Sequence, residues 1–145
     1  MALSQKCTYA LRAVLELAKA GVGRAVTIGD VAERQKIPVK FLEAILSQLK
    51  QGGFVESRRG AEGGYLLARP AARLTVGDII RFVEGPLAPV RYLEGRRGSG
   101  QPRDASVFAP VWAEAEKALA SIYDGVSFQD LVDRSRAEPV QNYEI

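Results

Sequence analysis

Apolar residues recur every three or four positions in three segments near the N-terminus, and this spacing predicts three successive helices. Ser4 is suited to cap the first, which covers residues 4–20. Thr27, followed three residues later by an acid as in a capping box, begins a second helix that runs to about Gln35. The third helix covers residues 39–51 and stops at a pair of glycines. The residues expected to be buried are Cys7, Leu11, Val14, Leu15 and Ala18 in the first helix, Ile28, Val31 and Ala32 in the second, and Leu42, Ile45, Leu46 and Leu49 in the third, while Arg12, Glu16 and Lys19 are expected on other faces of the first.

The pattern changes after the third helix to that of a short hairpin. Residues 54–58 and 65–68 have the composition of two strands, and glycines in the connecting residues 59–64 permit a tight reversal, the wing. A second capping-box pattern at Thr75 begins a further helix. Together these elements predict a winged helix-turn-helix domain over residues 1–84, so the fold class is mainly α with a small β-hairpin.

A loop and a long helix are expected in the C-terminal part. Residues 85–103 hold four Gly, three Pro and four Arg without an apolar period, which indicates a loop. A long helix is expected to start near Phe108 to Pro110, and Ser127 is suited to cap a short last helix. We therefore divide this part into a loop over 85–107, the two helices over 108–135 and a tail over 136–145.

The long helix carries an apolar seam whose members alternate by four and three, as in a coiled coil. The seam either packs on its own domain or pairs with a second copy of the chain. Because a lone helix beyond a loop rich in Gly and Pro needs a partner, we expect a homodimerisation helix. The seam consists of Phe108, Trp112, Ala115, Leu119 and Ile122.

Composition narrows the possible functions. The chain has 47% hydrophobic and 26% charged residues, as is usual for a soluble protein, and it shows neither a leader pattern nor a membrane-spanning apolar run, so we expect a cytoplasmic protein with no membrane association. One cysteine and no histidine exclude an intrachain disulfide and leave almost no nitrogen or sulfur ligands for a metal site. We find no phosphate-binding loop or nucleophile–base pair, and therefore do not expect an enzyme.

Charge directs attention to the N-terminal part as a partner for nucleic acid. Residues 1–60 carry ten Lys and Arg against five Asp and Glu, whereas residues 61–145 carry ten against twelve. The exposed face of the third helix would present Lys40, Glu43, Ala44, Ser47 and Gln51, a mixed set of donors, acceptors and a methyl group that suits base edges in the major groove.

Three further basic residues and one tyrosine flank this helix face. Arg58 and Arg59 stand at the wing, where they can reach phosphates or the minor groove, and Lys6 and Tyr9 stand near the start of the first helix. For Tyr9, core packing and phosphate contact are both open.

Each of these interpretations has an alternative. An ordinary solvated helix face is the alternative for each single residue, and a winged-helix module that binds only protein is the alternative for the whole domain. Salt dependence separates DNA binding from apolar docking.

Four segments together resemble a known family of regulators. They are Tyr9-Ala10-Leu11-Arg12, Phe41-Leu42-Glu43-Ala44-Ile45-Leu46, Arg59-Gly60-Ala61-Glu62-Gly63-Gly64-Tyr65, and Gly77-Asp78-Ile79-Ile80 followed by Glu84-Gly85. The chain is similar over nearly its whole length to the IscR/NsrR/CymR-type winged-helix regulators. That resemblance implies dimers that bind palindromic double-stranded DNA operators, often as repressors. The candidate DNA-binding residues are then Lys6, Tyr9, Thr27, Val39, Lys40, Glu43, Ala44, Ser47, Arg58 and Arg59.

The chain departs from the cluster-binding members of this family in one respect. Those members place three cysteines in the loop that corresponds to residues 85–103, where this chain has none, so we expect no iron–sulfur cluster and no other cofactor. Residues 84–90, Glu-Gly-Pro-Leu-Ala-Pro-Val, are similar instead to the cluster-lacking branch that regulates cysteine metabolism.

Two further features of the sequence have an ordinary and a functional interpretation. The resemblance implies cysteine synthase as a partner, bound through the C-terminal residues Tyr143, Glu144 and Ile145, although a terminus without a function is the alternative. Cys7 lies near a helix start, where a thiol can be acidic and redox-active, but it also falls on the apolar stripe. We favour a small buried residue at this position.

Overall fold

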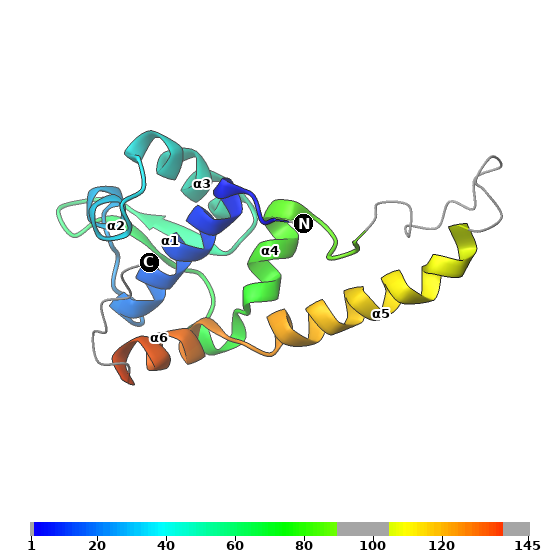
Figure 1. The fold of residues 1–145 in the computed structure, drawn as a ribbon. Coiled ribbons are helices and arrows are strands. Elements are labelled where there is room, and N and C mark those ends of the chain that lie inside the picture. Colours follow the sequence, from blue (N-terminus) through cyan, green and yellow to red (C-terminus); the bar gives the residue numbers. More distant parts are fainter. Residues whose placement is uncertain (1, 90–104, 138–145) are drawn as a thin grey trace.

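The computed structural model describes residues 2–89 and 105–137. Figure 1 shows a helical head from which one long helix, α5, projects. The elements in chain order are α1 (Gln5–Ala20), α2 (Ile28–Gln35), α3 (Val39–Gln51), β1 (Val55–Arg58), β2 (Gly64–Leu67), the 3-10 turn η1 (Ala71–Arg73), α4 (Val76–Glu84), α5 (Ala105–Asp124) and α6 (Phe128–Ala137). The predicted fold class, mainly α with a small hairpin, is confirmed.

Side-chain caps set several of the helix starts. The Ser4 hydroxyl accepts a hydrogen bond from the Cys7 amide, 3.1 Å away, at the start of α1. At α4, Thr75 and Asp78 bond reciprocally to each other's backbone N–H groups at 3.1 and 3.0 Å, which is the complete capping box. The last helix begins with the same reciprocal pair of bonds, made by Ser127 and its partner three residues later. These are local interactions, and the sequence pattern predicted these three helix starts correctly.

The core of the head forms around α1. Val14 and Leu17 of α1 are almost fully buried, and the predicted stripe of α3, Leu42 to Leu49, packs against them. The short helix α6 returns to this core instead of extending along α5, because Phe128 and Val132 are buried in the same cluster. The head therefore contains elements from both ends of the chain.

The two C-terminal helices are longer than the apolar pattern suggested. The helix α5 begins at Ala105, ahead of the expected start near Phe108, and α6 extends through Ala137. Pro110 stands inside α5, where its ring removes one backbone N–H from the helix. A proline is tolerated best near a helix start, and for this reason the sequence pattern placed the start of α5 too late.

None of the described helices is long and apolar enough to cross a membrane.

Glu16 is buried, contrary to the expectation that it would lie on an outer face of α1. Only 4% of its surface is exposed, yet its carboxylate is well satisfied. One carboxylate oxygen accepts a hydrogen bond from the Gln35 side-chain amide at 2.6 Å and lies 3.5 Å from the Lys19 ammonium; the other lies 3.8 Å from Arg34. The sequence pattern placed Glu16 on an outer face because its side chain is charged. In the structure, Gln35 and Arg34 on α2 compensate the charge, and this lowers the cost of burying it.

Candidate nucleic-acid interface

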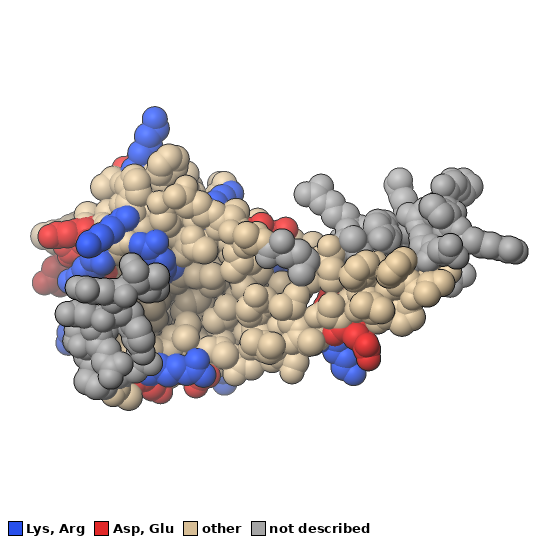
Figure 2. All heavy atoms as spheres, viewed as in Figure 1, with Lys and Arg blue, Asp and Glu red and all other residues tan. Residues whose placement is uncertain are grey.

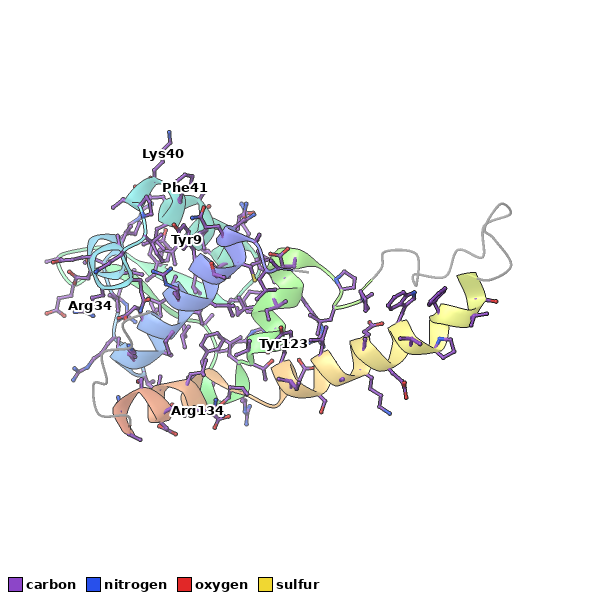
Figure 3. All side chains as sticks on the ribbon, viewed as in Figure 1. Tyr9, Arg34, Lys40, Phe41, Tyr123 and Arg134 are labelled. Atoms are coloured by element: carbon purple, nitrogen blue, oxygen red, sulfur yellow. The ribbon has the colours of Figure 1, made fainter. Side chains whose placement is uncertain are left out.

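The exposed face of α3 carries polar groups that the fold does not use. Leu42, Ile45, Leu46 and Leu49 are buried and fix the orientation of the helix. Lys40, Glu43 and Ser47 are exposed on the outer side, and within the described residues they make no hydrogen bond or ion pair. Figure 3 shows Lys40 projecting away from the head. Ala44 and Gln51 of the predicted face are also exposed, and so is Val39 at the start of the helix, at 47%.

A polar network holds α2, and the turn that leads to α3, against α1. Arg12 donates from its Nε to the Gln35 side-chain oxygen at 3.2 Å and from its terminal nitrogen to the Gln35 carbonyl oxygen. The Gln35 amide then donates to the buried Glu16. The turn itself passes through Lys36, whose φ of 53° lies in the left-handed region. This network and the turn together set where the exposed face of α3 points.

The wing is a two-stranded antiparallel hairpin fixed to the head at its base. Arg58 pairs with Gly64 across the strands, and Tyr65 exchanges two backbone hydrogen bonds of 2.8 Å with Val26. Arg58 donates a hydrogen bond to the Gly23 carbonyl oxygen at 2.8 Å, so part of this guanidinium supports the wing. Arg59 is exposed and has no partner within the described part of the chain. The two wing arginines are therefore not equivalent.

The remaining predicted contacts lie on or next to α1. Lys6 is exposed, and Tyr9 is half-buried with its hydroxyl 3.0 Å from the Gln5 amide that donates to it. The Arg12 guanidinium lies over the Tyr9 ring, 5.4 Å from its centroid. Thr27 is exposed, and its hydroxyl accepts the Asp30 N–H at 3.1 Å as the cap of α2. Tyr9 therefore packs against the core of the head and remains partly exposed.

An additional surface joins α1 to α3, and sequence reasoning did not single it out. We name it the α1–α3 hollow; its volume is about 330 Å³. Phe41 is 57% exposed beside it, next to Lys40 in Figure 3. The spacing of Phe41, Ala44 and Gln48, at i, i+3 and i+7, was a signal that could have revealed a second stripe on α3. The lining residues are Gln5, Lys6, Tyr9, Phe41, Ala44, Ile45 and Gln48.

The predicted seam of α5 is partly uncovered. Phe108 and Ile122 are 52% and 63% exposed, while Trp112, Ala115 and Leu119 are half-buried. The rings of Phe108 and Trp112 stack with centroids 5.9 Å apart. Val107 and Val111, which the seam did not include, are also exposed and broaden the apolar face. Figure 2 shows a largely uncharged surface along α5.

At its C-terminal end α5 is joined to the head by charge. The Arg81 guanidinium of α4 donates two hydrogen bonds, of 2.6 and 2.8 Å, to the Asp124 carboxylate. This contact holds the pKa of Asp124 below its ordinary value, chiefly through the hydrogen bond from Arg81. Gly77 is buried directly beneath the pair, where a Cβ would overlap the Asp124 carboxylate. The end of α5 that carries Asp124 is therefore fixed to α4.

Cys7 has the environment of an unreactive thiol. It is fully buried, and burial, together with the nearby Glu84 carboxylate, raises the pKa of the thiol to about 11. Ser4, one turn earlier, donates its backbone N–H at 2.8 Å and its hydroxyl to that carboxylate. These hydrogen bonds hold the pKa of Glu84 below its ordinary value.

The predicted partner-binding residues Tyr143, Glu144 and Ile145 lie outside the described residues. The hypothesis that they bind cysteine synthase therefore stays a prediction.

Residues 3–134 match the Rrf2 family, which is described as iron-dependent transcriptional regulators. The chain belongs to the Rrf2 family. It is 35% identical to a Mycobacterium tuberculosis protein named as an HTH-type transcriptional regulator, over 97% of this chain and 86% of the relative. It is 31% identical to the HTH-type transcriptional regulator CymR of Bacillus subtilis, over 95% of this chain and 94% of the relative. Its relatives are transcriptional regulators, and we describe this Rrf2-family chain as a DNA-binding transcriptional regulator.

Solved structures agree with this assignment. The global cysteine regulator CymR of B. subtilis superimposes with a TM-score of 0.77 at 30% identity, covering 92% of this chain and 98% of that one. The T. potens IscR structure has the same TM-score and identity and covers 99% of this chain and 95% of that one. The resemblance to winged-helix regulators of the IscR and CymR type is thereby confirmed.

The iron dependence in the family's description does not fit the ligands in this chain. Iron–sulfur clusters are held mainly by cysteine thiolates, with histidine as the less common replacement. This Rrf2-family chain has one cysteine and no histidine, and that cysteine is buried in the core with a raised pKa. The described residues contain no group of three His, Cys, Asp or Glu side chains that could hold a metal ion. The residues of this chain therefore do not fit an iron–sulfur cluster.

Proposed function

We propose that this Rrf2-family protein is a cytoplasmic, homodimeric repressor that binds a palindromic operator. In this proposal α3 lies in the major groove, and the wing reaches the adjacent backbone or minor groove. The observation that supports it best is the exposed face of α3, where Lys40, Glu43 and Ser47 have no partner within the described residues. Lys can donate to guanine or phosphate, Glu can accept from the cytosine amino group, and Ser can do either.

The wing supports the same proposal through the difference between its arginines. Because Arg58 is partly engaged with the Gly23 carbonyl, Arg59 is the better candidate for a phosphate or minor-groove contact. Lys6 and the hydroxyl of Thr27 would add backbone contacts at the two sides of α3. The role that we assign to Tyr9 is to hold Arg12 and to present the edge of its ring to the duplex.

Homodimerisation is proposed from the exposed apolar face of α5. Val107, Phe108, Val111 and Ile122 are each more than half exposed on a helix that projects from the head. Helices that carry such a face normally bury it against a partner. A second copy would bring two α3 helices to half-sites about one helical turn, roughly 10 bp, apart or a multiple of it.

Control of cysteine metabolism is the regulatory role that we propose, without an iron–sulfur cluster. Its support is the similarity to CymR, which is described as a global cysteine regulator, together with the ligand set of this chain. The comparison with IscR is equally close in structure, so the target genes have to be established by experiment.

The test is selection of bound sequences from a random duplex pool, repeated with Glu43→Ala and Arg59→Ala. We expect a palindrome in which Glu43→Ala relaxes the preference at one base pair per half-site, and in which Arg59→Ala weakens binding without changing the consensus. Asp133→Ala and Arg134→Ala on α6 are the matched controls, since both side chains are exposed on another element. The selected sites are then compared with the promoters of cysteine genes in the source genome.

Two results would contradict the proposal. Recovery of no consensus would favour a winged-helix module that binds protein. Binding that does not weaken as the salt concentration rises would point the same way, because phosphate contacts make DNA binding strongly salt-dependent.

A further inference from the structure

Phe41 is an unexplained residue on the proposed DNA-binding face. It is 57% exposed on α3, although the same helix buries four other apolar side chains almost completely. Ile45, one turn further on, is only 4% exposed. Side chains close to Phe41 on the same helix are therefore buried against the head, whereas Phe41 is not. Phe41 lies beside Lys40 and lines the α1–α3 hollow together with Ala44, so it belongs to an apolar patch and is not an isolated exposed side chain.

The surroundings of Phe41 divide the exposed surface of α3 into two stripes. Lys40, Glu43 and Ser47 form the polar stripe discussed above. Phe41 and Ala44 form the apolar part of the second stripe, which continues to the polar Gln48 and borders the α1–α3 hollow of about 330 Å³. On the α1 side the hollow is bordered by Lys6, whose ammonium is exposed, and by the half-buried Tyr9.

The chemistry of this apolar stripe matches one group of the major groove. Base edges in that groove offer hydrogen-bond donors and acceptors, and the 5-methyl group of thymine is their apolar feature. A stripe of Phe41 and Ala44 cannot accept or donate through its side chains, but it can bury a methyl group. Lys6 at the border would meet the phosphates beside the base.

We propose that Phe41, together with Ala44, determines sequence specificity by contacting a thymine 5-methyl group in each half-site. Glu43 and Phe41 then read neighbouring positions through different chemistry, a hydrogen bond and an apolar contact. This inference rests on the proposed function, because it assumes that α3 enters the major groove.

The experiment replaces each thymine of the selected operator by uracil, one position per half-site at a time, which removes only the methyl group. We expect one or two positions at which the wild-type protein loses about fourfold in affinity per half-site, the equivalent of exposing one buried methyl group. Phe41→Ala should bind the thymine and uracil duplexes equally at that position, and Phe41→Leu should keep most of the difference. Measurement at low salt keeps weak variants within range, because phosphate contacts are then strongest.

The controls separate this inference from the proposed function. Val22→Ala, at a fully exposed apolar residue between α1 and α2, should retain the whole thymine–uracil difference. Equal binding of all uracil operators by the wild type, or an undiminished methyl preference in Phe41→Ala, would overturn the inference while leaving the proposed function in place. Failure to select any operator would instead contradict the proposed function.

Discussion

Lys36 lies at the point where α2 turns toward α3. Its φ of 53° places a residue with a Cβ in the left-handed region, and it is the C-cap of α2, where its N–H bonds to the Ala32 carbonyl. Helices commonly end with a residue in this conformation, and glycine is preferred there because it has no Cβ to clash. The turn of the helix-turn-helix is therefore built with a small amount of backbone strain at one residue.

Replacing Lys36 by Gly should stabilise the protein by about 0.5 kcal/mol, because the relief of strain exceeds the extra entropy of glycine in the unfolded chain. Urea denaturation at neutral pH measures the change. Lys40→Gly, the same substitution at a helical position of α3, should destabilise the protein by about 0.5–1 kcal/mol. Destabilisation by both variants would contradict the role that we assign to Lys36.

Cys7 should behave as a core residue in solution. Its thiol has a pKa of about 11, against an ordinary 9.0, so little thiolate is present near neutral pH. We expect the folded protein to react with a thiol-specific reagent at pH 8 at least about 100-fold more slowly than the protein unfolded in guanidinium. Comparable rates would show that the thiol is accessible, and would reopen a redox role.

The same shift has a consequence for stability at high pH. Folding favours the neutral thiol, so this contribution to stability is complete below pH 9.0 and is lost as the pH rises toward about 11. Cys7→Ala should remove that part of the pH dependence, as measured by denaturation at several pH values.

At the scale of elements, polar contacts position α2 against α1, and the wing is held against the segment that joins these two helices. Arg12, Gln35 and Glu16 connect the two helices through a buried network, although the contact between helices in most of the head is apolar. At the wing, Gly64 lies so close to Val26 that a Cβ would overlap the Val26 carbonyl. Both contacts hold parts of the proposed DNA-binding surface in place.

Glu16→Ala should lower the free energy of unfolding by about 2 kcal/mol, because the Gln35 amide and the neighbouring cations lose a buried acceptor. Chemical denaturation measures the loss. Glu33→Ala, at an exposed acid on α2, should change stability by less than about 0.5 kcal/mol. A similar small change for Glu16→Ala would mean that the network contributes little to stability.

Gly64→Ala should displace the wing and weaken DNA binding, whereas Gly60→Ala should weaken it less. Both glycines have positive φ, 144° and 107°, so both substitutions strain the backbone. Gly60, however, has open space where a Cβ would be added. Titration of the selected operator with each variant separates loss of wing position from backbone strain, and equal losses would contradict the importance of the contact with Val26.

At the scale of the whole molecule, the head is self-contained and α5 is not. Figures 1 and 2 show α5 extending from the head with a largely uncharged surface. The Arg81–Asp124 ion pair joins its C-terminal end to α4. The Nε1 atom of Trp112 is buried and has no hydrogen-bond partner within the described residues. A helix with these properties is suited to pairing with another chain.

Ile122→Asp should dissociate the proposed dimer, since it puts a charge on an apolar residue that is 63% exposed in the single chain. Sedimentation at micromolar concentration should show a monomer of the mass of one chain, 15.7 kDa, with a large loss of operator affinity. Val22→Asp on the head should leave both mass and affinity unchanged. An unchanged mass for Ile122→Asp would show that this part of α5 does not form the dimer interface.

Local pattern was enough to predict most of the helices, the hairpin and the likeness to a family of regulators. Helix caps at Ser4, Thr75 and Ser127 are local hydrogen bonds, and the buried stripe of α3 follows from periodicity, so both could be inferred without a fold. The absence of cluster ligands from the 85–103 loop is likewise a property of the residues themselves.

Which polar residues the fold uses, and which stay exposed without a partner in the described residues, depends on contacts between elements. Glu16 is buried because α2 supplies an amide and a cation, and Arg58 is partly engaged because the Gly23 carbonyl lies beside the wing. Phe41 is exposed because α1 and α3 meet around a hollow, and α6 returns to the core through contacts distant in sequence. Periodicity describes one helix at a time, whereas these outcomes depend on which atoms of another element lie within reach.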